Sequence, residues 1–160
     1  MTYFADLESC TYFSDDPAPA LRSVGWLEDG HAYTKGAVAP EDVRALERLA
    51  VGTWQPMYAA GWHNCSLCGK TDEDDPYFRK IDGEEKLLGV DNIFVPSGDV
   101  MYVAPTLILH YIEAHGYKPP DEFLRAVRAT DPSKPEYTLP ALNEVKARVT
   151  PAGRVEVLGT

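Results

Sequence analysis

The chain has 160 residues, of which 44% are hydrophobic, 11% aromatic and 25% charged. This length and composition are typical of a globular protein with one core, so a single domain over residues 1–160 is expected. Acidic residues outnumber basic ones by 25 to 15, for a formal net charge of −10. Because phosphate backbones are bound mainly through clustered Lys and Arg, this charge argues against a nucleic-acid partner. A net negative charge can simply keep the protein soluble, or it can attract a basic protein partner and speed their association.

The sequence also contains information about the cellular compartment of the protein. The first residues contain no basic segment followed by a long apolar stretch, and no window approaches the ~20 apolar residues of a membrane span. The three cysteines do not form a disulfide framework, since Cys10 has no close neighbour in sequence. A cytoplasmic protein without a membrane partner is therefore expected.

Residues 1–36 are rich in aromatic and turn-forming residues, and short strands are expected near Thr11–Phe13 and Ser23–Leu27. A first helix is expected from Pro40, a favoured first helical residue, to the residue before Gly52. Its apolar face would be formed by Val43, Leu46, Leu49 and Ala50.

The middle of the chain predicts a loop followed by a hairpin. The acidic run Asp72–Asp75 lacks the spacing of a calcium loop and is expected to be a solvated loop. The apolar stretches Val90–Val95 and Val100–Val103 predict a β-hairpin with a four-residue connection over Pro96–Asp99.

In the rest of the chain, proline and glycine residues mark where helices are expected to begin and end. Pro105 can open a helix that passes through His110 and His115 until Gly116 caps it. A short helix is expected from Asp121 to about Val127, a further helix over Leu139–Val149 and a last strand over Arg154–Leu158. The expected class is α+β, with a small antiparallel sheet and two or three short helices around one structural zinc site.

The most informative pattern is C-x2-C…H-x4-H, formed by Cys65, Cys68, His110 and His115. Two thiolates on a tight turn can bind one side of a tetrahedral ion, and two imidazoles from a later helix can complete the coordination. The sequence therefore predicts a Zn²⁺ site with these four residues as ligands.

Other interpretations of these residues stay open. A C-x2-C pair can be a redox dithiol, although no strand followed by a helix is evident around it. The two histidines can be ordinary helix residues. Positions five apart on a helix differ by about 140°, so both would reach one ion only if the last turn unwinds near Gly116. His63, two residues before Cys65, is an alternative fourth ligand.

A closed set of four ligands indicates a structural zinc, whereas a catalytic zinc keeps an open position for water. Glu113 lies between the two histidines and could act as a base in a hydrolase. However, neither H-E-x-x-H nor the zinc-deaminase order of motifs is present, and no G-x-S-x-G or phosphate-binding loop occurs. No catalytic residue is therefore assigned.

Several motifs resemble a family of small, uncharacterised bacterial proteins. They are the runs Tyr3–Leu7, Gly25–Leu27, Trp54–Pro56, Gly61–Cys68, Tyr102–Ile108, His110–Ile112 and His115–Pro120. The resemblance extends over about residues 3–128 and corresponds to a GWHxCxxC…YVAPxLIxHYIxxHxYxPP pattern. It implies a metal site and a bacterial cytoplasmic protein, and it implies nothing about a reaction.

The function expected from the sequence is that of a small zinc-stabilised binding protein without catalysis. Such a protein could be an immunity or regulatory factor whose acidic surface meets a basic protein partner. A zinc-dependent hydrolase and a redox protein that uses Cys65 and Cys68 are the alternatives.

Overall fold

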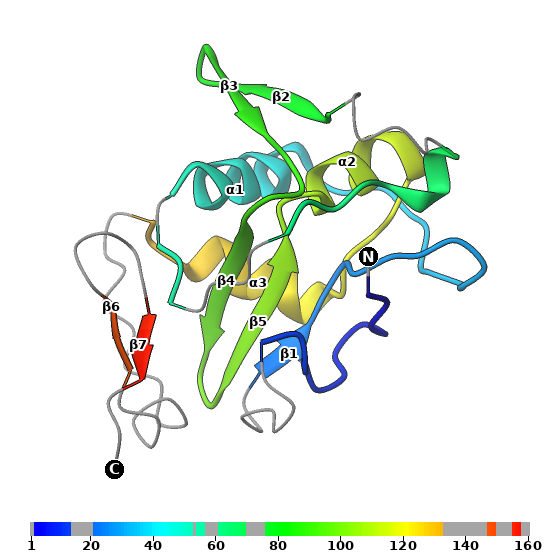
Figure 1. Cartoon of the computed structure of the whole chain (residues 1–160). Helices are drawn as coiled ribbons and strands as arrows, with labels where there is room; N and C mark the ends of the chain where they lie inside the picture. Colours follow the sequence, from blue (N-terminus) through cyan, green and yellow to red (C-terminus); the bar gives the residue numbers. More distant parts are fainter. Residues whose placement is uncertain are drawn as a thin grey trace.

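The computed structural model describes residues 2–13, 21–52, 54–56, 61–69, 76–132, 147–149 and 155–157. In these ranges the chain has three α-helices, one 3₁₀ turn and small sheets, which confirms the expected α+β class (Figure 1). The elements are β1 (Leu21–Ser23), α1 (Pro40–Val51), η1 (Ser66–Cys68), β2 (Phe78–Ile81), β3 (Glu84–Leu87), β4 (Asn92–Ser97), β5 (Val100–Pro105), α2 (Ile108–His115), α3 (Asp121–Ala129), β6 (Ala147–Val149) and β7 (Val155–Val157). The single domain over residues 1–160 stays a prediction.

The central sheet has the order β1-β5-β4. Strands β4 and β5 form the expected hairpin, but Ser97 pairs with Val100, so only Gly98 and Asp99 connect them. Gly98 has a positive φ of 57°, which allows this tight reversal. Strand β1 pairs in parallel with β5, so the sheet is mixed rather than purely antiparallel.

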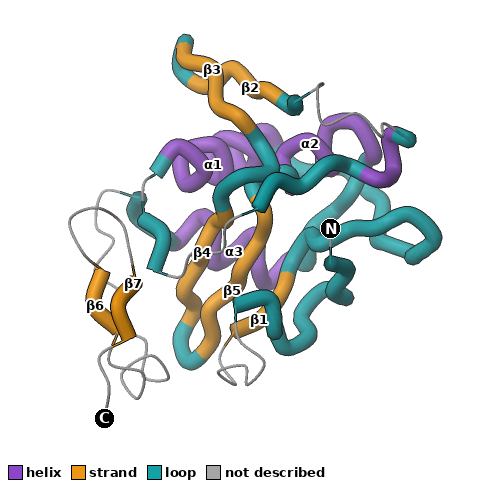
Figure 2. Tube along the Cα trace, viewed as in Figure 1, coloured by secondary structure: helices purple, strands orange, loops and turns teal. Residues whose placement is uncertain are grey.

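Both faces of this sheet are buried, and each face belongs to a different hydrophobic cluster. Side chains alternate along β4, so Ile93 and Val95 face the cluster that includes the helices, whereas Phe94 faces the other. The second cluster is built around Trp26 of the N-terminal segment, whose indole nitrogen donates to the carbonyl oxygen of Val103 at 2.9 Å. Figure 2 shows helix α3 and the N-terminal loops on opposite sides of β4 and β5.

The helices follow the sequence closely, with one shift. Helix α1 begins at Pro40 and ends before Gly52, and α3 begins at Asp121, as expected. Helix α2 begins at Ile108 rather than at Pro105, because β5 continues through Pro105, which pairs with Asn92. Gly116 ends α2 in the left-handed conformation, with φ 62°.

Some expectations about strands and the C-terminal part were wrong. Residues 11–13 form no strand, and the strand expected at Ser23–Leu27 is instead β1, at Leu21–Ser23. Ala147–Val149, expected to end a helix, forms strand β6 and pairs with β7, because the valines of both segments favour an extended chain. The rest of that expected helix and the acidic run Asp72–Asp75 lie outside the described residues.

Strands β2 and β3 form a second hairpin, which the sequence interpretation missed. Its turn is Asp82-Gly83, and both residues have positive φ, 51° and 89°. An Asp-Gly pair between two strands is a strong hairpin signal, so the information was present. Figure 1 shows this hairpin above α1 and α2.

Candidate metal centre

Cys65 and Cys68 lie on a tight turn that precedes the β2–β3 hairpin. Cys65 precedes the 3₁₀ turn η1, and its carbonyl oxygen accepts the amide of Cys68 at 3.4 Å. Gly69 closes the turn with a positive φ of 63°. This geometry directs the two sulfur atoms of a C-x2-C pair to the same side, as a metal knuckle requires.

His110 and His115 lie on helix α2, which follows β5 directly. His110 is in the first turn, and His115 is the last helical residue. The amides of both Gly116 and Tyr117 bond to the carbonyl oxygen of Tyr111, so the C-terminal end of the helix is fixed. In addition, the Tyr33 hydroxyl donates to the carbonyl oxygen of His115 at 3.3 Å.

The four side chains converge. One potential ligand atom from each of Cys65, Cys68, His110 and His115 lies within 4.8 Å of all the others. The Cys68 sulfur is 3.2 Å from Nε2 of His110 and 3.3 Å from Nε2 of His115, and the Cys65 sulfur is also 3.3 Å from Nε2 of His115. A tetrahedral zinc with two sulfur and two nitrogen ligands would have S···N separations of ~3.5 Å. The cluster therefore has the composition and the size to hold a metal ion.

The expectation that the last turn of α2 must unwind was wrong. The helix continues through His115, yet the His110 and His115 ring centroids are only 5.1 Å apart. At ~100° per residue, Tyr111 and Ala114 lie between the two histidines on the helix surface. Both imidazoles nevertheless reach the cysteines, since Nε2 of each histidine lies within 3.3 Å of the Cys68 sulfur.

His63 is not part of this group. Its Nε2 is 2.7 Å from the Tyr12 hydroxyl, and its ring packs edge-on against Trp26, with centroids 6.1 Å apart. Burial lowers the pKa of His63 and favours its neutral form. The structure thus places His63 in the aromatic cluster of the N-terminal segment rather than beside Cys65.

The segment before the turn is fixed by a close backbone approach. The His63 amide donates to the Gly89 carbonyl oxygen at 2.8 Å, and a Cβ on Gly89 would lie 2.4 Å from the His63 carbonyl oxygen. Gly89 also has a positive φ of 86° and donates its amide to the Thr106 hydroxyl at 3.0 Å. Only glycine fits both requirements, so Gly89 sets where the cysteines meet α2.

The β2–β3 hairpin region covers one side of the cluster. The Tyr77 ring, just before β2, packs on His110 with centroids 4.3 Å apart. Arg79 on β2 binds Glu47 of α1 and Glu113 of α2, both at 2.7 Å. Glu113, the residue considered as a possible base, is 73% exposed and engaged by this arginine.

The protonation of the cluster follows from its burial. Cys65 is fully buried, and this burial raises its pKa to about 11, against the opposing effect of the Cys68 and Leu67 amides. Burial also lowers the pKa of His115, and the positive charge of Lys35 adds to this effect. At neutral pH the metal-free cluster therefore contains a Cys65 thiol and a neutral His115 imidazole.

The sequence pattern predicts the four clustered residues but not the groups that pack around them. Tyr77 and Arg79 carry no local motif, and the Asp82-Gly83 turn was the only available sign of the hairpin to which they belong. The role of Gly89 depends on a contact with His63, which cannot be derived from local sequence.

None of the helices in the described ranges combines the length and apolar character needed to cross a membrane. Comparisons with curated proteins and with solved structures gave no match. A family model described as a domain of unknown function, DUF7919, matches residues 2–128, a range that includes all four clustered residues. The chain therefore belongs to the DUF7919 family, an uncharacterised domain family with a cysteine and histidine cluster in this member.

Proposed function

We propose that this chain is a zinc-stabilised binding protein without catalysis, in which Cys65, Cys68, His110 and His115 hold one structural Zn²⁺. The observation that carries the proposal is the convergence of four ligand atoms within 4.8 Å, from a turn and a helix that are distant in sequence. Such a set can fill all four positions of a tetrahedral ion.

The donor set favours zinc over other common ions. Calcium and magnesium prefer oxygen ligands, whereas two thiolates with two imidazoles suit Zn²⁺. When bound, the ion would cross-link the η1 turn to α2, two segments that are distant in sequence. The role of the ion would be to hold these two segments together.

Two features of the surroundings support a structural rather than a catalytic role. Four protein donors leave no position for a water nucleophile. Glu113 is ion-paired with Arg79 on an exposed surface, so it is not held as a base that points at the ligands. Zinc-dependent hydrolysis, and thiol–disulfide exchange by Cys65 and Cys68, are the alternatives, and each has its own assay below.

The binding role rests on charge and on exposed aromatic side chains. With a net charge of −10, the protein would attract a basic partner and speed its association at low salt. Trp62 and Phe78 are 45% and 57% exposed. Aromatic side chains of this kind often anchor protein interfaces. We therefore propose a protein partner with a basic surface, as for an immunity or regulatory factor.

The test combines metal removal with thermal unfolding. The metal-loaded protein is treated with a chelator, melted, and melted again after one equivalent of zinc is restored. A structural ion at about a thousand times its dissociation constant contributes ~4 kcal/mol. At ~2–4 °C per kcal/mol for a chain of this size, chelation should lower the Tm by roughly 10 °C, and zinc should restore it.

A different result would favour one of the alternatives. An unchanged Tm after complete metal removal would contradict a structural role. Hydrolytic turnover that depends on zinc and disappears in Glu113→Gln, while the Tm is kept, would favour the hydrolase. A reversible Cys65–Cys68 disulfide in metal-free protein at a physiological potential would favour the redox protein.

A further inference from the structure

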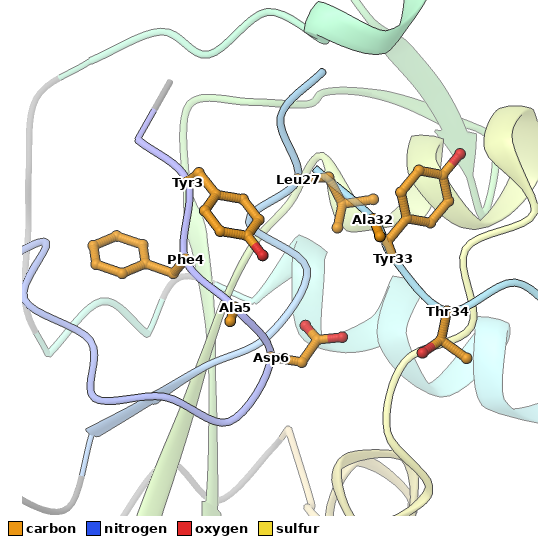
Figure 3. Close-up of a pocket in the computed structure, with 8 residues that line it drawn as sticks. All are labelled: Tyr3, Phe4, Ala5, Asp6, Leu27, Ala32, Tyr33 and Thr34. Atoms are coloured by element: carbon orange, nitrogen blue, oxygen red, sulfur yellow. The ribbon is translucent and has the colours of Figure 1, made fainter. Parts of the chain in front are cut away.

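A pocket of about 190 Å³ lies between the N-terminal segment and the segment that precedes α1. It is lined by Tyr3, Phe4, Ala5, Asp6, Leu27, Ala32, Tyr33 and Thr34 (Figure 3). At ~30 Å³ per water molecule, it has room for about six waters, or for one small organic molecule.

Oxygen atoms line one side of this pocket. In Figure 3 the Asp6 carboxylate lies between the Tyr3 hydroxyl and the Thr34 hydroxyl. The lining also includes apolar groups, among them the side chains of Leu27 and Ala32. A ligand that fits would therefore carry several hydrogen-bond donors at one end and a short aliphatic stem.

Asp6 is the only charged residue of the lining. Its Oδ1 atom accepts the Gly25 amide at 2.9 Å and the Tyr117 hydroxyl at 2.8 Å, which fix the carboxylate in place. Among the described residues, no Lys, Arg or His forms an ion pair with it. Burial raises its pKa, because the charged form lacks a full hydration shell. A cation in the pocket would offset this cost.

We propose that this pocket is a binding site for a small primary alkylammonium ion, with Asp6 as the counter-charge. The N–H donors of the ammonium group can bind the Asp6 carboxylate together with a neighbouring hydroxyl, and the alkyl stem would lie along Leu27 and Ala32. The negative charge of the whole protein further raises the local concentration of cations.

The pocket is coupled to the candidate metal centre but does not depend on it. Tyr33 of its lining donates to the carbonyl oxygen of His115, and Tyr117 joins Asp6 to the end of α2. The site nevertheless contains no residue of the cysteine and histidine cluster. Its test is therefore independent of the zinc proposal.

The test is a titration of the purified full-length protein with n-butylammonium chloride at low salt, followed by two-dimensional NMR. Shifts should saturate and should be largest for residues 3–6 and 32–34. n-Butanol, which has the same stem without the charge, should bind at least about tenfold more weakly. Equal binding of both compounds, or no saturable shift with the amine, would overturn the proposal.

Two variants locate the site. Asp6→Asn keeps an oxygen acceptor for Gly25 and Tyr117 but removes the charge, so it should weaken amine binding about tenfold or more. Asp99→Asn removes the same charge from the exposed β4–β5 turn and should leave binding unchanged. If Asp6→Asn fails to fold, Ala32→Leu tests the same point, because it fills the pocket at an exposed position. Amine binding that survives in Asp6→Asn or in Ala32→Leu would contradict the assignment.

Discussion

At the scale of single residues, Cys65 and Cys68 differ from Cys10, although Cys65 and Cys10 are both almost completely buried. Cys10 packs in the aromatic cluster around Trp26, whereas Cys65 and Cys68 lie within 3.3 Å of histidine nitrogens. This contrast provides a matched comparison between a cysteine that packs and two cysteines that are placed to bind a metal.

We predict that Cys65→Ser and Cys68→Ser lose zinc and lower the Tm by roughly 10 °C, since structural zinc binding is part of the folding free energy. Cys10→Ala should lower the Tm through lost packing alone and should keep its zinc. Elemental analysis and thermal melts measure both quantities. Full zinc content in either serine variant would exclude that cysteine as a ligand.

The fourth ligand is tested by a pair of histidine variants. His115→Ala should weaken zinc binding by more than the ~10–100-fold typical of losing a group that only hydrogen-bonds to a ligand, because it removes a direct donor. His63→Ala should keep the zinc affinity and lower only the stability, through loss of the Tyr12 contact. Competition with a chromophoric chelator measures both. The reverse pattern would assign the ligand to His63.

The protonation of Cys65 gives zinc binding a defined pH dependence. Because its pKa in the metal-free protein is raised to about 11, Cys65 carries a proton at pH 7, which the metal must displace. His115 is already neutral there and releases none. Zinc binding should therefore release at least one proton at pH 7 and weaken as the pH falls. Calorimetry in buffers of different ionisation enthalpy checks this, and binding without proton release would contradict it.

At the scale of secondary-structure elements, Gly89 connects the sheet to the turn that carries the cysteines. We predict that Gly89→Ala destabilises the protein by several kcal/mol, since the added Cβ meets the His63 backbone and the φ of 86° is strained for alanine. Zinc affinity should fall as well, because Cys65 would be displaced from α2. Gly30→Ala, which also has a positive φ but open space around it, is the matched control. Equal effects of both variants would mean that the contact with His63 is unimportant.

The accuracy of the sequence interpretation also varied from element to element. Helices α1 and α3 were predicted because proline and acidic residues mark where they begin, and β4 with β5 because apolar β-forming residues flank a turn. Parallel pairing of β1 with β5 joins residues far apart in sequence, so no local pattern could indicate it. The Asp6 pocket was missed for the same reason, since its key contact is with Tyr117.

At the scale of the whole molecule, the sheet separates two hydrophobic clusters, and the candidate metal centre lies on the side of the helices. Cys65 and Tyr111 belong to that larger cluster, so a metal there would add to a core that already exists. A metal would therefore support this fold rather than replace its core. We therefore expect the metal-free protein to be folded but less stable.

The central claim is that four protein ligands hold one zinc, and X-ray absorption at the zinc edge of the purified protein tests it most directly. We predict one zinc per chain, bound by two sulfur atoms at ~2.3 Å and two nitrogen atoms at ~2.0 Å, with no oxygen ligand. A metal content well below one per chain, or a zinc with three protein ligands and a water oxygen, would contradict it.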